Sequence, residues 1–298
     1  MRSSVLRSAS VMTVMTLLSR VLGLVREQVR ALYLGTGAAS DAFGLAATIP
    51  NLFRRLLAEG AMTAAFVPVF AEYLKRGDEE ATRAFLSRFV TLLTMVVVLL
   101  AIGGVLITPW LIDTFFSSEF KNVPGKVQLT IWLTQLMWPY LALVSLAAVI
   151  QAVLNTEKIF APSAFTPVLL NACIIGCGVG LAHTLPNPAY ALVAGFLFGG
   201  VVQIGFQVPF LLRWTRVRFG PDFRVFGPGV RRVLWIMVPG IWGAGIYQIN
   251  VFVSQLIAST LEGGSIASLQ YGIRLQELVL GLFVVSVAQV ILPTLSHQ

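Results

Sequence analysis

Six arginines lie within apolar stretches of the sequence that otherwise suit lipid better than water. They are Arg20, Arg26, Arg30, Arg54, Arg55 and Arg274. A charged side chain at the centre of a membrane-spanning helix costs roughly 2.5–3.5 kcal/mol on insertion scales, so each arginine needs a partner or a function. Arginine binds phosphate oxygens through two parallel N–H donors. These residues therefore predict an anion site that favours phosphate or pyrophosphate over a simple inorganic ion.

Helical spacing places the arginines of the first stretch on one face. At about 100° per residue, Arg20, Arg26 and Arg30 fall within about 120° of that helix, together with Glu27. The rest of the helix is apolar. One polar face on an otherwise apolar helix is typical of a cavity wall.

The second stretch has a similar polar face. Asp41, Arg55 and Glu59 align within about 40° of one another, Asn51 lies beside them, and Arg54 points farther round. The apolar stretches between residues 86 and 260 carry no charge in their interiors. The sequence therefore predicts a central cavity whose polar lining comes from the first, second and last helices.

The charge balance of this face leaves two interpretations open. Six arginines stand against four acids, namely Asp41, Glu27, Glu59 and Glu277. An anionic ligand would supply the missing negative charge. Alternatively, the pairs Arg55–Glu59, Arg30–Glu27 and Arg274–Glu277 neutralise one another within the bundle.

Covalent or metal chemistry finds little support in the sequence. Ser19 stands beside Arg20 without a base, so it is predicted to pack or to contact substrate, and Cys173 and Cys177 to pack between helices. No metal-ligand spacing and no phosphate-loop glycine pattern occurs. We therefore expect neither an enzyme nor a metal or other cofactor.

The composition sets the broad class of the protein. Of its 298 residues, 57% are hydrophobic and 11% are charged, whereas soluble proteins carry about 25% charged residues. This excludes a soluble globular enzyme. The net charge of +8 is more typical of a membrane topology signal than of nucleic-acid binding, so nucleic acid is not expected as a partner.

Long uncharged runs predict the membrane spans of an all-α polytopic protein. A helix needs roughly 20 apolar residues to cross ~30 Å of hydrocarbon. Five runs meet this requirement plainly, near residues 86–115, 127–155, 160–183, 189–213 and 231–260. Three less pure stretches, 8–34, 41–74 and 265–296, bring the prediction to about eight transmembrane helices.

The loops indicate the orientation. With the amino terminus inside, the inner segments hold Arg2, Arg7, Lys75, Arg76, Arg83, Arg88, Lys158, Arg213, Arg216, Arg218, Arg224, Arg231 and Arg232, and the outer loops hold Lys121 and Lys126. Positive residues favour the cytoplasmic side. Both ends of the chain are therefore expected in the cytoplasm.

A weak internal repeat suggests the domain organisation. The segment from the 34–43 turn to Pro68 resembles the segment from the 261–269 turn to Pro293. Transporters often contain such repeats. This predicts a six-helix lobe over residues 1–226 and the first two helices of a second lobe over 227–298.

Several sequence blocks closely resemble the MurJ (MviN) lipid II flippases of the MOP exporter superfamily, whose fold is MATE-like. The blocks are 19–27 (SRVLGLVRE), 35–43 (GTGAASDAF), 49–61 (IPNLFRRLLAEGA), 65–73 (AFVPVFAEY), 154–156 (LNT) and 271–277 (YGIRLQE). The resemblance implies that Arg20, Arg26, Arg54 and Arg274 bind the pyrophosphate, that Ser19, Asn51, Glu59 and Glu277 orient them or contact the sugar, and that Glu27, Asp41 and Arg55 line or gate the cavity. Two positions depart from the family, which usually has Asp where Glu27 and Ile273 stand.

The resemblance also implies a function. Lipid II, an undecaprenyl-pyrophosphate-linked disaccharide-pentapeptide, would be moved by alternating access across the bacterial cytoplasmic (inner) membrane for peptidoglycan synthesis. Membrane lipid and the cell-wall synthesis machinery are the further partners implied. Family members have about fourteen helices, so the chain is expected to be a fragment of a longer protein or a truncated product.

Three alternatives remain from the sequence. One is a flippase for another lipid-linked oligosaccharide. A cation-coupled drug antiporter is disfavoured because its cavity would need unpaired acids rather than surplus arginines. The third is a non-transporting membrane scaffold that binds lipid-linked precursors.

Overall fold

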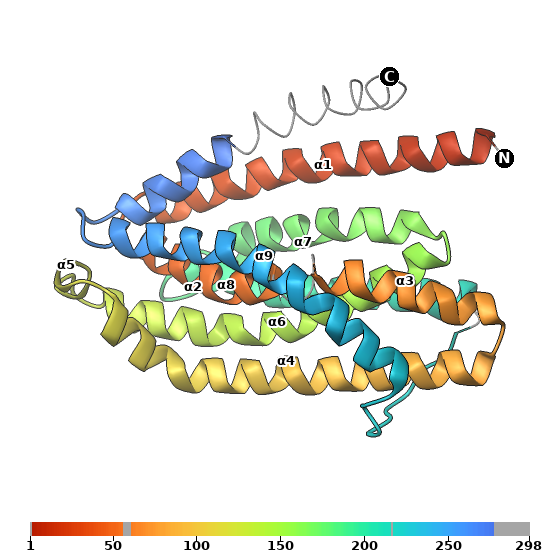
Figure 1. The fold of residues 1–298 in the computed structure, drawn as a ribbon. Helices are drawn as coiled ribbons and strands as arrows, with labels where there is room; N and C mark the ends of the chain where they lie inside the picture. Colours follow the sequence, from red (N-terminus) through yellow and green to blue (C-terminus); the bar gives the residue numbers. More distant parts are fainter. Residues whose placement is uncertain (1, 56–60, 216, 277–298) are drawn as a thin grey trace, which may run out of the picture.

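A computed structural model describes residues 2–55, 61–215 and 217–276, and over these residues the chain is a helical bundle without strands (Figure 1). The helices are α1 (Arg2–Leu34), α2 (Ala38–Arg54), α3 (Ala61–Arg76), α4 (Glu79–Phe115), α5 (Ser118–Lys121), α6 (Lys126–Thr156), α7 (Phe160–Leu181), α8 (Pro188–Trp214) and α9 (Pro228–Ala258). Residues 265–276 form a further helical stretch. The predicted all-α class is confirmed.

Five helices among the described residues are long and apolar enough to cross a membrane, namely α4, α6, α7, α8 and α9. They coincide with the five plain uncharged runs of the sequence. Helix α1 has 33 residues, which extend about 50 Å at 1.5 Å per residue. The stretch predicted at 41–74 corresponds to α2 and α3, on either side of residues 56–60, and the described part of the last stretch ends at residue 276.

Local sequence signals explain where individual helices begin. The carboxylate of Asp78 accepts a hydrogen bond from the Ala81 N–H at 2.9 Å, and two acidic residues follow in the first turn of α4. The cap satisfies a free backbone N–H group of the first turn, and the acidic residues offset the positive end of the helix dipole. The Asn187 side chain caps α8 in the same way, with Pro188 at the first helical position. The turns between apolar runs are thus encoded locally.

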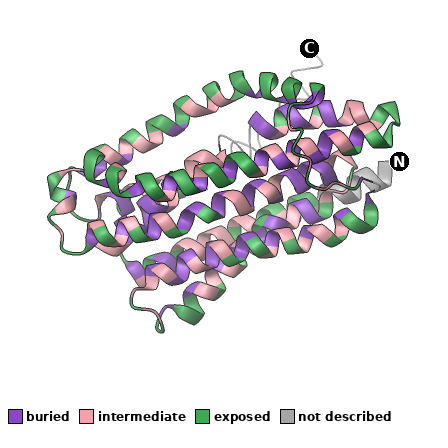
Figure 2. Cartoon of the chain, turned by 90° about the horizontal axis from the view of Figure 1, so that it is seen from below, coloured by how far each residue is buried: buried purple, intermediate pink, exposed green. Residues whose placement is uncertain are grey.

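Helix α6 lies in the middle of the bundle and packs against α2, α4 and α8, while α1 packs on α7 and α9 packs on α3. Buried residues gather along the inner helices and exposed residues along the outer faces (Figure 2). Glycines on α8 permit a close approach to α6 and α7. A Cβ at Gly195 would lie 2.6 Å from Ile174 Cα on α7, and one at Gly200 would lie 2.9 Å from Leu143 Cβ on α6. Small residues promote helix association in lipid because they let the helix backbones pack closely. The hydrophobic effect contributes little to this association, since lipid already surrounds the apolar side chains.

The segment between α8 and α9 is pinned along α4. The Arg88 Nε donates to an Asp222 carboxylate oxygen at 2.9 Å, and the backbone N–H groups of Gly220 and Asp222 donate to the hydroxyls of Ser87 and Thr91. The Arg224 backbone N–H, and then the Arg88 guanidinium, hold the pKa of the Asp222 carboxyl below its usual value. The segment 217–227, which we call the strap, is therefore held against α4 by several hydrogen bonds.

Candidate functional site

A cavity of about 190 Å³ lies between α1, α2 and the 265–276 helix on one side and α6 to α9 on the other. Five arginines are among the described residues that line it: Arg26, Arg30, Arg54, Arg55 and Arg274. One carboxylate, that of Glu27, is in the same described lining. The described part of the cavity wall therefore carries a surplus of positive charge.

Helix α1 contributes a paired guanidinium and carboxylate. Arg26 Nη2 lies 2.7 Å from Glu27 Oε1, and Arg26 Nη1 donates to Asn171 Oδ1 at 3.0 Å. The Asn171 amide in turn donates to the Ser19 carbonyl at 3.1 Å. Neighbouring groups thus fix the direction of Arg26 while leaving part of its side chain accessible from the cavity.

Helix α2 contributes a second cation. Arg54 Nε donates to Asn51 Oδ1 at 2.8 Å, which is an i, i+3 contact on one helix face. Asn51 and Arg55 line the cavity beside it. Asn51 thus holds the Arg54 guanidinium in place on α2.

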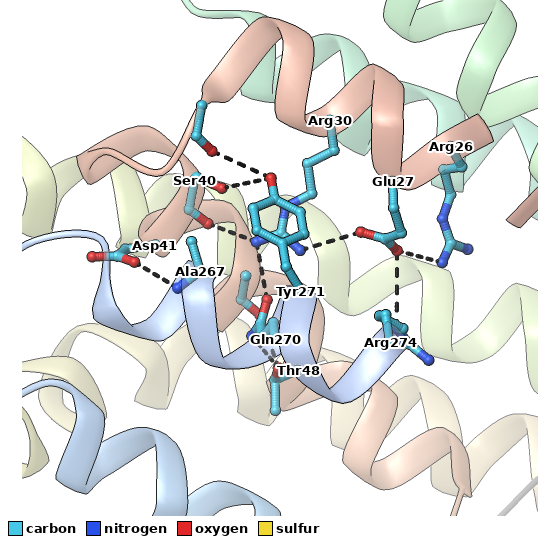
Figure 3. A network of polar contacts seen from close by, with 12 residues as sticks. Arg26, Glu27, Arg30, Ser40, Asp41, Thr48, Ala267, Gln270, Tyr271 and Arg274 are labelled. Atoms are coloured by element: carbon cyan, nitrogen blue, oxygen red, sulfur yellow. Dashed lines mark hydrogen bonds and ion pairs between the residues drawn. The ribbon is translucent and has the colours of Figure 1, made fainter. Parts of the chain in front are cut away.

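Arg274 reaches the cavity from the 265–276 helix. Its Nε lies 3.9 Å from Glu27 Oε1, so Glu27 stands between cations of two helices (Figure 3). The sequence leaves Arg274 without an acid at the preceding position, where Ile273 stands. In the structure, Glu27 of α1 is a charge partner of Arg274. The two residues are far apart in the sequence, so this pairing could not be predicted from it.

Asp41 lies elsewhere than predicted. It is fully buried, its Oδ2 is 2.7 Å from Lys126 Nζ, and its two oxygens also accept from the Gly264 and Ala267 N–H groups at 2.8 and 2.9 Å. It is not among the described residues of the cavity lining. Lys126, counted from the sequence as an outer-loop cation, is likewise buried at the first position of α6.

The remaining predicted residues fall outside the cavity or outside the described chain. Ser19 and Arg20 lie on α1 but are not in the described lining. Glu59 and Glu277 lie outside the described residues. The pairs Arg55–Glu59 and Arg274–Glu277 therefore stay predictions, while the Arg30–Glu27 pair is present at 3.6 Å.

Sequence reasoning missed the uncharged polar residues of the lining. Helix α9 presents Tyr247, Gln248 and Gln255 to the cavity, and α6 presents Tyr140. A single glutamine or tyrosine in an apolar run gives no signal of its own, because such residues also satisfy hydrogen bonds in cores. The lining thus combines guanidinium groups with neutral polar side chains, an arrangement suited to an anion joined to a polar group.

Among the residues that the structure describes, no group of three or more His, Cys, Asp or Glu side chains is placed to hold a metal ion.

Comparisons with known proteins agree on one family. The family described as "Lipid II flippase MurJ" matches residues 30–298. A Vibrio cholerae protein named "Probable lipid II flippase MurJ" is 40% identical over 299 residues, which are 98% of this chain and 57% of that protein. The chain thus spans little more than half the length of this relative.

Solved structures show the same fold. A structure described as "Lipid II flippase MurJ, inward closed conformation" superposes with a TM-score of 0.78 at 28% identity, over 96% of this chain and 59% of that one. An inward-facing multidrug resistance MATE transporter of the MOP superfamily superposes with a TM-score of 0.72 at 17% identity, over 88% of this chain and 58% of that one. The predicted MOP/MATE-like bundle is confirmed.

Proposed function

Because this chain belongs to the MurJ family of lipid II flippases, we propose that it takes part in moving lipid II across the bacterial cytoplasmic (inner) membrane. The undecaprenyl-pyrophosphate-linked disaccharide-pentapeptide is the substrate, and its pyrophosphate is held by the cavity arginines. No bond of the lipid is made or broken. Transport feeds precursor to the cell-wall synthesis machinery on the outer side.

The arginine excess of the cavity carries this proposal. Five guanidinium groups face one carboxylate among the described lining residues, and a bound pyrophosphate would offset part of this positive surplus. Arg26 and Arg54 come from different helices and are already oriented by Asn171 and Asn51. Guanidinium groups that converge from several helices favour an anion with oxygens on several sides.

Alternating access would use the two parts of the chain as separate lobes. We assign residues 1–226 to the first lobe and residues 227–298 to the second. Contacts between the two parts include the packing of α9 on α3 and the ion pair of Arg232 with Glu72, at 2.6 and 2.9 Å. This pair is exposed, so it is weak enough to break during a cycle.

Lipid binding tests the proposal directly. The purified protein should retain lipid II and undecaprenyl pyrophosphate, and should bind undecaprenyl monophosphate about tenfold or more weakly. Each lost charge-assisted hydrogen bond is worth about 1.5–3 kcal/mol, and 1.4 kcal/mol is tenfold. Native mass spectrometry with competing lipids measures the ratio. Equal retention of the monophosphate, or of a neutral lipid, would refute the pyrophosphate site.

The topology of the proposal is tested by thiol labelling. Cysteines at Gly37 and Gly263 should react with an impermeant reagent from outside, whereas one at Lys75 should react from inside. Glycines 37 and 263 have open space around a new Cβ, but a Cβ at Gly264 would collide with the Thr36 carbonyl at a φ of +96°. Gly264 is therefore avoided. The opposite labelling pattern would reverse the orientation.

A further inference from the structure

Arg30 is the most enclosed of the cavity arginines and joins three segments of the chain. Its side chain is 9% exposed. Nη2 donates at 3.0 Å to both the Ser40 carbonyl and Gln270 Oε1, and the guanidinium lies between the rings of Phe43 and Tyr271, at 5.1 and 4.9 Å (Figure 3). These contacts link α1, the start of α2 and the 265–276 helix.

The surrounding polar contacts extend this junction toward one end of the bundle. Tyr271 Oη donates to the Gly35 carbonyl at 3.3 Å and lies 3.2 Å from Ser40 Oγ. Toward the cavity, the amides of Gln270 and Gln255 both donate to Thr48 Oγ1, at 3.3 and 3.0 Å. The junction therefore stands between the cavity and the turns at 35–37 and 259–264.

A glycine on α2 makes room for the junction. A Cβ at Gly44 would collide with the carboxamide of Gln270 and would lie 2.9 Å from Arg30 Nη2. Arg30 and Gln270 can meet over α2 because this position has no side chain. An alanine there would separate them without removing any polar group.

We propose that Arg30 closes the cavity toward the 35–37 and 259–264 turns and that Glu27 couples this closure to the occupancy of the anion site. Opening to that side separates the 265–276 helix from α1 and α2, so the Arg30–Gln270 hydrogen bond and the cation–π contact of Arg30 with the Tyr271 ring must break. The closure follows from the geometry of the junction alone. The coupling rests on the proposed function, because it needs an anion at Arg26 and Arg274.

The coupling follows from the position of Glu27 between the two groups of arginines. Its Oε1 lies 2.7 Å from Arg26 Nη2 and 3.9 Å from Arg274 Nε, and its Oε2 lies 3.6 Å from Arg30 Nη1. A bound pyrophosphate takes over the donors of Arg26 and Arg274. The released carboxylate then pairs more closely with Arg30 and draws it away from Gln270. Occupancy of the site thus loosens the closure.

Side-specific labelling tests the closure without any lipid. The reporter is Ala47→Cys in the cavity lining, with Cys173→Ser and Cys177→Ser as background. The impermeant reagent is added to the side from which Gly37→Cys is labelled. Gly44→Ala and Arg30→Ala should each raise the labelling rate from this side about tenfold. Gly176→Ala, a helical glycine with open space around it, is the matched control and should leave the rate unchanged.

Two results would overturn the closure. One is an unchanged rate in Gly44→Ala in normally folded protein. The other is an equal rise from both sides, which would indicate generally looser packing. Should Arg30→Ala fail to fold, Gly44→Ala decides alone, because it keeps every polar group of the junction.

Titration with undecaprenyl pyrophosphate tests the coupling. Labelling of the reporter should rise several-fold with lipid in the otherwise unchanged protein and stay flat in Glu27→Gln, with each protein compared at lipid concentrations that saturate it by native mass spectrometry. The same rise in Glu27→Gln would refute the coupling. If no pyrophosphate lipid binds to either protein, the proposed function and the coupling both fail, while the closure stands or falls on Gly44→Ala.

Discussion

Replacing Lys126 by methionine should lower the free energy of unfolding by about 3–5 kcal/mol, because it leaves the buried carboxylate of Asp41 without its counter-ion. The Asp41 and Lys126 side chains are 1% and 3% exposed. Asp41 also accepts the N–H groups of Gly264 and Ala267, so its charge joins α2, α6 and the turn before the 265–276 helix. Loss of Lys126 should therefore loosen three segments together.

Thermal unfolding in detergent measures this effect, and the chain offers a matched control. Lys121 and Asp113 form an exposed ion pair at 3.3 Å, so Lys121→Met should change stability by less than about 1 kcal/mol. The double variant Lys126→Met/Asp41→Asn should recover much of the loss, because no unpaired charge remains buried. Equal small effects at Lys126 and Lys121 would show that the buried pair contributes no more than a surface pair.

Alanine at Arg26, Arg54 or Arg274 should each weaken binding of lipid II about tenfold or more. Each substitution removes at least one hydrogen bond between charged groups, worth about 1.5–3 kcal/mol. Lysine at the same positions should restore little of the lipid II binding, because it keeps the charge but loses the planar pair of donors. Native mass spectrometry and precursor export in cells depleted of their own flippase measure the two consequences.

The control for the arginine variants is Arg83→Ala, which removes the same charge from an exposed position of α4. It should bind lipid II as the unchanged protein does. If the arginines serve mainly to neutralise carboxylates, the result differs. Arg26→Ala then destabilises the protein through Glu27, and adding Glu27→Gln restores stability and binding together. Unchanged binding in all three well-folded alanine variants would refute the pyrophosphate site.

Much of the fold follows from the sequence because lipid imposes a simple rule on helix composition. The five plain uncharged runs coincide with α4, α6, α7, α8 and α9, since a backbone in hydrocarbon must satisfy its own hydrogen bonds within a helix. Packing partners do not follow so directly. The approach of α8 to α6 and α7 depends on Gly195 and Gly200, and isolated glycines in an apolar run do not reveal which helix they face.

Helical periodicity predicted those parts of the candidate site that depend on one helix face. It could not predict the contacts between segments that are far apart in the sequence. Arg26, Arg30 and Arg55 line one cavity, in agreement with their places on the polar faces of two helices. Arg54 lines it as well, although helical projection points it farther round α2. Asp41 shares such a face in projection, yet it pairs with Lys126, 85 positions away. Helical projection contains no information about a partner on another helix, so a buried structural pair and a cavity charge look alike in the sequence.

The strap between α8 and α9 limits how far the two proposed lobes can swing apart at this end. Asp222 is held on α4 by Arg88 and Thr91, so the length of chain available to α9 runs only from there to Pro228. Six Cα steps extend to about 20 Å at most. The beginning of α9 is therefore tethered close to the amino-terminal part of α4, and any rocking of the second lobe must have its small amplitude here and its large amplitude at the opposite end of the bundle.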